Sequence, residues 1–172
     1  MKPDDLKLFF LLLALGGANV ATAQGLVGAK HISSALAHEA VGAAVAACAK
    51  NGYTVTAIIV SSDGVRQAML RGDGAAVHTL DSAYAKAYTA ASLAPVRKED
   101  STKAISERIA KTPGVSTAGL ASLPYINFTP GGVTIMAGGE AIGGIGVGGA
   151  PGGNFDDDCA RAALAQIRDR MK

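Results

Sequence analysis

The chain has 172 residues, of which 49% are hydrophobic and 17% are charged, and this balance excludes an intrinsically disordered protein. Its length suits a single domain. The formal net charge is only +2, and no Lys/Arg run or interleaving of basic and aromatic residues is present. We therefore expect no nucleic-acid partner.

The N-terminal residues have the pattern of a secretory signal peptide. Lys2 and Lys7 precede an almost unbroken apolar run over residues 8–15, and Ala21-Thr22-Ala23 supplies the small residues of a cleavage site. The apolar run is shorter than the roughly 20 residues that span a bilayer, so we expect no stable membrane anchor after cleavage. The sequence thus predicts a signal peptide over residues 1–23, a mature domain over residues 24–172, and a periplasmic or secreted protein.

Apolar periodicity and turn residues predict the order α-β-β-α-α-β-β-α between residues 33 and 171. The first half comprises helix 33–51, strands 55–61 and 65–71 around a Ser62-Asp63-Gly64 turn, and a helix from about residue 79 that stops before Pro95. The second half begins with a helix that is capped by Asp100 or Ser101 and ends before Pro113, and a loop-rich connection over 113–131 follows it. Strands 133–137 and 141–147 come next, and a helix from Asn154 to about Met171 ends the chain's predicted elements. Two hairpins separated by helices indicate an α+β fold with a four-stranded antiparallel sheet flanked by helices, in a profilin-like arrangement.

A glycine-rich tract over residues 144–149 matches the dinucleotide-binding pattern G-x-G-x-x-G by letter. That fingerprint requires a helix that opens inside it, whereas these glycines lie within a predicted strand and Pro151 follows. Gly144, Gly146 and Gly148 share one face of the strand, because side chains alternate between faces. A face without side chains lets a helix, a neighbouring subunit or a flat ligand approach the backbone closely.

His78 is the histidine that we expect at a binding site, because it lies between a glycine-rich turn and the start of a helix. Such junctions place side chains at cleft mouths, and a neutral imidazole is a good ligand for haem iron. Tyr84 and Tyr88 are one helical turn apart and share a face. Arg71 and Lys86 are cations near the same segment, and an arginine can pair with a ligand carboxylate.

The remaining candidates are interpreted as structural. His31 is near the mature N-terminus and is expected to be a mobile surface residue, and His38 lies among alanines on the first predicted helix. Asp156-Asp157-Asp158 lies at a helix start, where carboxylates stabilise the positive end of the helix dipole. No further oxygen ligands accompany these aspartates in the sequence, so we expect no cation site there.

The two cysteines, Cys48 and Cys159, leave two states open. Neither belongs to a C-x-x-C motif, so a redox motif, a zinc site and covalent haem attachment lack support. An oxidising compartment would permit one disulfide between them. Both lie on alanine-rich helical stretches, where cysteine commonly acts as a small buried hydrophobe, and this context favours free thiols.

Several segments together resemble the GlcG/HbpS family, which includes the C-terminal domain of PduO-type proteins. Each motif is short, but their order and spacing are specific. They are Val60 to Gly64, Arg71 to Ala75, Ser82 to Ala90, Gly131 to Ile135, Ile142 to Gly149, and Asp158 to Ala160. The sequence departs from the family at Gly148-Gly149, where a Ser-Gly pair is common.

The resemblance implies a single α/β domain with an antiparallel sheet, often assembled into homo-oligomers. It also implies haem binding in the best-understood members, whereas others belong to glycolate or propanediol metabolism. The leading hypothesis is therefore an exported protein that binds haem non-covalently, with His78 as iron ligand and Arg71 or Lys86 near the propionates. The alternative is an enzyme or accessory factor that acts on a small hydroxy-acid-type metabolite.

Overall fold

The structure is a computed structural model, and it describes residues 25, 28–114 and 116–171. The predicted signal peptide, residues 1–23, lies outside the described residues. In chain order the elements are α2 (Ser34–Ala49), β1 (Thr56–Ser61), β2 (Arg66–Arg71), α3 (Thr79–Val96), α4 (Thr102–Lys111), α5 (Ala118–Ala121), β3 (Gly132–Ala137), β4 (Glu140–Gly148), α6 (Gly153–Ile167) and the 3₁₀ turn η1 (Arg168–Arg170). Among the described residues, no helix is both long and apolar enough to cross a membrane.

The four strands form one antiparallel sheet in the order β2-β1-β4-β3. Each predicted hairpin contributes one edge strand and one central strand, and the central pair β1–β4 joins the two hairpins. In this central pair, Thr56 lies opposite Gly148 and Ser61 lies opposite Gly143. The predicted α+β class and four-stranded antiparallel sheet are confirmed.

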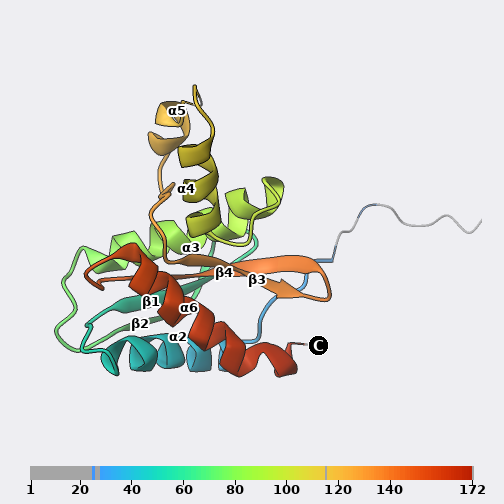
Figure 1. The fold of residues 1–172 in the computed structure, drawn as a ribbon. Coiled ribbons are helices and arrows are strands. Elements are labelled where there is room, and N and C mark those ends of the chain that lie inside the picture. The colour runs from blue at the N-terminus through green and yellow to red at the C-terminus, as the bar shows by residue number, and fades with distance from the viewer. Residues whose placement is uncertain (1–24, 26–27, 115, 172) are drawn as a thin grey trace, which may run out of the picture.

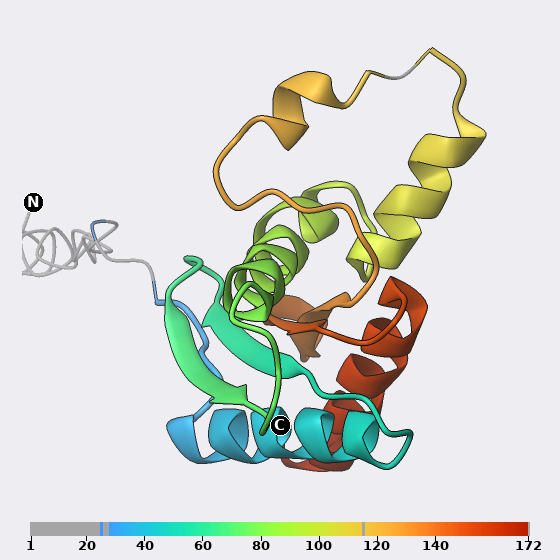
Figure 2. The same ribbon diagram turned by 90° about the vertical axis from the view of Figure 1, so that its left-hand side faces the viewer.

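Helices cover both faces of the sheet (Figures 1 and 2). Helix α3 crosses one face over β1, β3 and β4, while α2 and α6 lie side by side on the other face. Residues of β1 alternate between the two layers: Ile58 and Val60 pack with α3, whereas Ala57 and Ile59 belong to the core beneath α2 and α6. Helices α4 and α5 extend from the α3 side, away from the sheet (Figure 1).

The glycine face of β4 lies against α3. A helix therefore occupies this face, rather than a neighbouring subunit or a flat ligand. A Cβ on Gly146 would lie 2.0 Å from the carbonyl oxygen of Ala83, and one on Gly144 would lie 2.4 Å from that of Ala87. Real Cβ atoms do not approach backbone this closely. The missing side chains therefore set the distance between α3 and the sheet.

The ends of two helices differ from the prediction. Helix α3 continues through Pro95 to Val96, because a proline in the last turn removes only one hydrogen bond and the helix ends beyond it anyway. Helix α6 begins at Gly153, and its N-cap is Gly152 rather than Asn154. Of the two caps predicted for α4, Ser101 is confirmed, and Ser33, for which no cap was predicted, caps α2. Each side-chain oxygen accepts a hydrogen bond from the first turn of its helix.

Cys48 and Cys159 form a disulfide, so the favoured free-thiol interpretation is wrong. The bond joins α2 to α6, with 5.5 Å between the two Cα atoms. The thiols meet because the two helices pack side by side, which the alanine-rich sequence of each helix does not disclose. Both cysteines are nevertheless buried in the same core, as expected for a small hydrophobe.

Candidate functional site

His78 is the N-cap residue of α3, and its side chain makes no capping hydrogen bond. The residue is exposed, as are His31 and His38. Arg71 closes the turn that leads to His78, because its guanidinium donates two hydrogen bonds to the carbonyl oxygen of Ala75, one of them 2.8 Å long. The structure therefore gives Arg71 a role in shaping this loop.

Tyr84 and Tyr88 share a face of α3, as predicted, and Tyr125 joins them. The ring centroids of Tyr84 and Tyr125 are 4.9 Å apart in an edge-on arrangement, and those of Tyr88 and Tyr125 are 6.0 Å apart. The hydroxyl of Tyr84 donates to the carbonyl oxygen of Gly64 at 3.1 Å. The guanidinium carbon of Arg66 lies 3.5 Å from the Tyr84 ring centroid, which is a cation–π contact.

The third ring of this tyrosine cluster is held by a strained backbone. Tyr125 has a φ of 65°, in the left-handed region that residues other than glycine rarely adopt. The buried hydroxyl of Thr89 fixes this segment to α3: it accepts a hydrogen bond from the backbone N–H of Asn127 at 2.8 Å and lies 3.3 Å from the carbonyl oxygen of Tyr125. Such strain persists where surrounding contacts enforce it, and it often marks functional sites.

A cavity of about 470 Å³ opens beside this cluster. Tyr88 and Leu93 of α3 form one wall, and Leu123, Tyr125 and Ile126 of the connection before β3 form the other. Leu123 and Tyr125 are each about half exposed, so their apolar atoms face solvent. We name this hollow the tyrosine cavity. Its size and its mostly apolar lining are those of small-molecule sites.

Lys86 lies on a different face of α3 and does not join the tyrosine cluster. Only 4% of its side chain is exposed, and its ammonium donates to Asp156 at 2.7 Å and to the carbonyl oxygen of Val147 at 3.0 Å. The backbone N–H of Ala150 donates to the second carboxylate oxygen of Asp156. Burial raises the pKa of Asp156, because desolvation of the carboxylate outweighs the attraction of Lys86. This buried ion pair ties α3 to α6.

Two aspartates at the start of α6 bind cationic side chains, a role that the sequence did not predict for them. Asp156 holds Lys86, and Asp157 accepts a hydrogen bond from Arg161 one turn further along the helix. Arg161 also donates to Asp100, and this contact lowers the pKa of Asp100. Within the described residues, no group of three or more His, Cys, Asp or Glu side chains could hold a metal ion.

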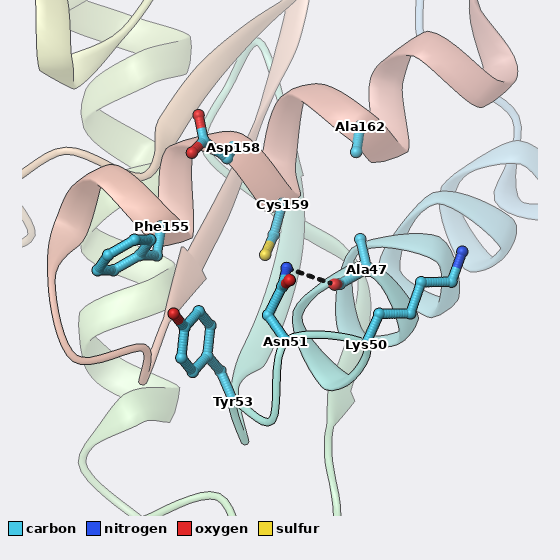
Figure 3. A pocket seen from close by; sticks show the side chains of 8 residues that line it. All are labelled: Ala47, Lys50, Asn51, Tyr53, Phe155, Asp158, Cys159 and Ala162. Carbon is cyan, nitrogen blue, oxygen red and sulfur yellow. Dashed lines mark hydrogen bonds between the residues drawn. The ribbon is translucent and has the colours of Figure 1, made fainter.

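The largest hollow that we describe, of about 560 Å³, lies between the C-terminal end of α2 and the first half of α6 (Figure 3). Tyr53 and Phe155 stand together at one side, with ring centroids 5.3 Å apart. Asn51 is held by a hydrogen bond to the carbonyl oxygen of Ala47. The sulfur of Cys159, bonded to Cys48, forms part of the wall.

The structure thus brings Tyr84 and Tyr88 together and directs Lys86 elsewhere. Sequence reasoning missed Tyr125 and Arg66, which come from an irregular connection and from an edge strand. No local motif marks either residue, because each reaches the cluster only through the packing of α3 against its neighbours. An aromatic residue in a proline- and glycine-rich loop was the one available signal for Tyr125.

The fold and the cavity define a class: a small α+β domain with one antiparallel sheet and a hollow of small-molecule size against its α3 helix. The family model described as "Haem degrading protein HbpS-like" matches residues 32–165. The chain therefore belongs to the HbpS-like family, as the resemblance in its sequence implied. No curated protein matches the chain.

Solved structures agree with this assignment. The chain is 36% identical to a double mutant of Streptomyces reticuli HbpS, covering 88% of this chain and 97% of that chain with a TM-score of 0.72. It is 25% identical to Klebsiella pneumoniae protein ORFY, covering 84% and 95% with a TM-score of 0.71. It is also 25% identical to the protein in a crystal structure of a PduOC:heme complex, covering 80% and 96% with a TM-score of 0.67.

Proposed function

We propose that this chain is an exported protein that binds haem non-covalently, for storage, transfer or sensing. Membership of the HbpS-like family and the similarity to PduOC, which was crystallised with heme, support the choice of ligand. The observation that carries the proposal is the tyrosine cavity, where two phenol groups stand among apolar side chains.

The residues of this cavity fit the chemistry of haem. Leucine and isoleucine side chains suit the flat apolar macrocycle, and a tyrosine oxygen is an established ligand of haem iron. Tyr88 and Tyr125 would supply that oxygen, and Arg66 beside Tyr84 would supply a cation for a propionate. When bound, haem supplies a redox-active iron.

The position of the iron ligand is the finer part of the proposal. The sequence predicts His78 as the iron ligand and Tyr88 as a further binding residue, and the structure adds Tyr125, which lines the same cavity as Tyr88. We expect the phenols to matter more than His78, because His78 is exposed at a helix end. Lys86 is left out of the proposed site, since its ammonium is buried against Asp156.

Haem titration of the purified protein tests the function and the site together. We expect a Soret band above that of free haem, which Tyr88→Phe or Tyr125→Phe shifts and His78→Ala leaves nearly unchanged. Tyr53→Phe is the matched control, because Tyr53 packs with Phe155 in the other cavity. A spectrum changed only by His78→Ala would restore the sequence prediction. A wild type without a Soret shift would end the haem proposal in favour of the small-metabolite alternative.

The same titration separates binding from turnover. The matched family model is described as haem degrading, so the absorbance should also be followed over time with and without a reductant. A binding protein keeps its Soret band. Steady bleaching that the tyrosine variants slow would instead assign an enzymatic activity to the cavity.

Export is proposed on the sequence of residues 1–23, and the disulfide supports it. Structural disulfides persist in oxidising compartments such as the periplasm and the extracellular medium. We expect intact-mass analysis from the native host to show a chain that begins at Gln24 and carries the bond between Cys48 and Cys159. A cytoplasmic chain that retains Met1 would contradict export.

We also propose that the protein forms a homo-oligomer. The edge strand β2 and the turn before it expose apolar side chains, since Val65, Met69 and Leu70 are 66%, 55% and 41% exposed. Exposed apolar edges favour association between chains. Light scattering at micromolar concentration should show at least a dimer, and a clean monomer would argue against this part of the proposal.

A further inference from the structure

A second cavity, of about 420 Å³, lies on the α2 side of the sheet, where the first described residues meet the end of the chain. Segment 30–33 borders it on one side, and Arg170 and Met171 border it on the other. The tyrosine cavity lies against α3, on the opposite face of the sheet. The two hollows are therefore separate places in the fold.

The floor of this second cavity is apolar and belongs to the main core. Ile32 and Ile142 are each 3% exposed, and Leu36 and Met171 pack beside them with part of their surface open. An aliphatic chain laid on such a floor is stabilised in proportion to the apolar surface that it buries. The floor therefore favours an apolar ligand of several carbons.

The rim is cationic and offers several hydrogen-bond donors. Lys30, His31 and Arg170 border the cavity, and they come from the two ends of the described chain. Lys30 pairs with Glu140 at 3.4 Å, and Arg170 pairs with Glu39. The Lys30 and Arg170 side chains are 66% and 51% exposed, and ion pairs this exposed contribute little to the stability of the fold. A ligand carboxylate can therefore replace a glutamate at little cost.

We propose that this cavity binds a molecule with an apolar body and a terminal carboxylate, held at its head by Arg170 and Lys30. The proposal stands on this cavity alone and is independent of the tyrosine cavity. A fatty acid has this chemistry, and so has haem with its propionates. Competition between decanoate and haem distinguishes these two sources.

Isothermal titration of decanoate into the full oxidised protein is the direct test. We expect one saturable site, binding about tenfold weaker in Arg170→Ala and in Lys30→Ala, because each variant removes a charge-assisted contact. Arg168→Ala is the matched control, an exposed arginine of the same 3₁₀ turn that does not border this cavity, and should bind as the wild type does. Decanol, with an uncharged head, should bind at least about tenfold more weakly.

Glu39→Gln gives the sharpest result, because it should strengthen decanoate binding. The substitution releases Arg170 from its charged partner, and a variant that merely disturbed the fold would weaken binding instead. Equal affinity for decanoate and decanol, no gain in Glu39→Gln, or equal losses in Arg168→Ala and Arg170→Ala would overturn the proposal.

Competition identifies the source of the carboxylate. If haem displaces decanoate, and does so equally in Tyr88→Phe, haem is the occupant of this cavity. If both ligands bind the same molecule at once, a fatty acid is the occupant. Failure of decanoate binding would refute this site and leave the Soret titration of the proposed function unaffected.

Discussion

The disulfide between Cys48 and Cys159 should account for a large part of the stability of the fold. It closes a loop over a sequence separation of 111 residues. In the chain-entropy description, a cross-link of that length removes about 5 kcal/mol of conformational freedom from the unfolded chain. The free energy of unfolding of a domain is about 5–15 kcal/mol in all. Loss of the bond should therefore leave only a marginally stable protein.

Urea denaturation followed by circular dichroism measures this contribution. Three samples are needed: oxidised wild type, wild type reduced with a dithiol, and the double variant Cys48→Ala/Cys159→Ala. Reduced wild type keeps both buried sulfur atoms, so its difference from the oxidised protein isolates the cross-link. The double variant should be less stable again by about 1–2 kcal/mol, because it also leaves small cavities in the core.

A difference below about 1 kcal/mol between oxidised and reduced wild type would refute the reasoning. It would mean that the packing of α2 on α6 already restricts the unfolded chain, or that the bond strains the native state enough to cancel its benefit. The urea midpoint and the slope of the transition separate these cases, since residual structure in the unfolded chain lowers the slope.

Three further predictions follow from the packing of α3 and from the charges around α6. Gly146→Ala should lower the free energy of unfolding by at least about 3 kcal/mol, because the added Cβ would lie 2.0 Å from the carbonyl oxygen of Ala83. Gly42→Ala on α2 is the control, since a Cβ there has no atom within 4 Å. In the same urea assay it should be neutral or stabilise the fold by up to about 1 kcal/mol. Lys86→Met should cost about 3–5 kcal/mol by leaving Asp156 buried without its partner, and Lys86→Met/Asp156→Leu should recover most of that loss. The pKa of Asp156 in the folded protein would rise further in Lys86→Met. The stability lost by this variant should therefore grow as the pH rises above about 4, the pKa of an aspartate in the unfolded chain. A stability loss that does not depend on pH would contradict this explanation. Arg161 lowers the pKa of Asp100, so their contact stabilises the fold above about pH 4, and this stabilisation is lost as the pH falls through the folded-state pKa. Asp100→Asn should remove that part of the acid transition, an effect of less than about 1 kcal/mol because the carboxylate is largely exposed. An acid transition that Asp100→Asn leaves unchanged would count against the contact.

Local signals in the sequence were sufficient to predict the architecture. Turn residues such as Ser62-Asp63-Gly64 predicted the hairpins. Ser101, one of two predicted caps, begins α4 through a hydrogen bond to a residue three positions along the chain. The alternation of glycine in β4 predicted a side-chain-free face correctly. These features depend on chemistry close in the chain, and so they can be recognised without a structure.

The site depended on contacts between distant segments. The partners of Lys86 and Cys48 lie on α6, and nothing near either residue in the sequence indicates them. Lys86 resembles an accessible cation until the register of α3 against α6 is known. Tyr125 likewise reaches the tyrosine cluster only because Thr89 fixes an otherwise irregular loop.

The order of the strands has a consequence for how the chain acquires its fold. The central pairing joins Thr56 to Gly148 and Ser61 to Gly143, so the middle of the sheet forms between segments that are far apart in the chain. Neither hairpin forms the whole sheet alone, and β1 cannot pair along its second edge until β4 has been synthesised. Pairings at such long range slow folding relative to local ones. A nascent chain would therefore remain open through most of its synthesis, which is the condition in which a polypeptide can still be threaded through a narrow pore.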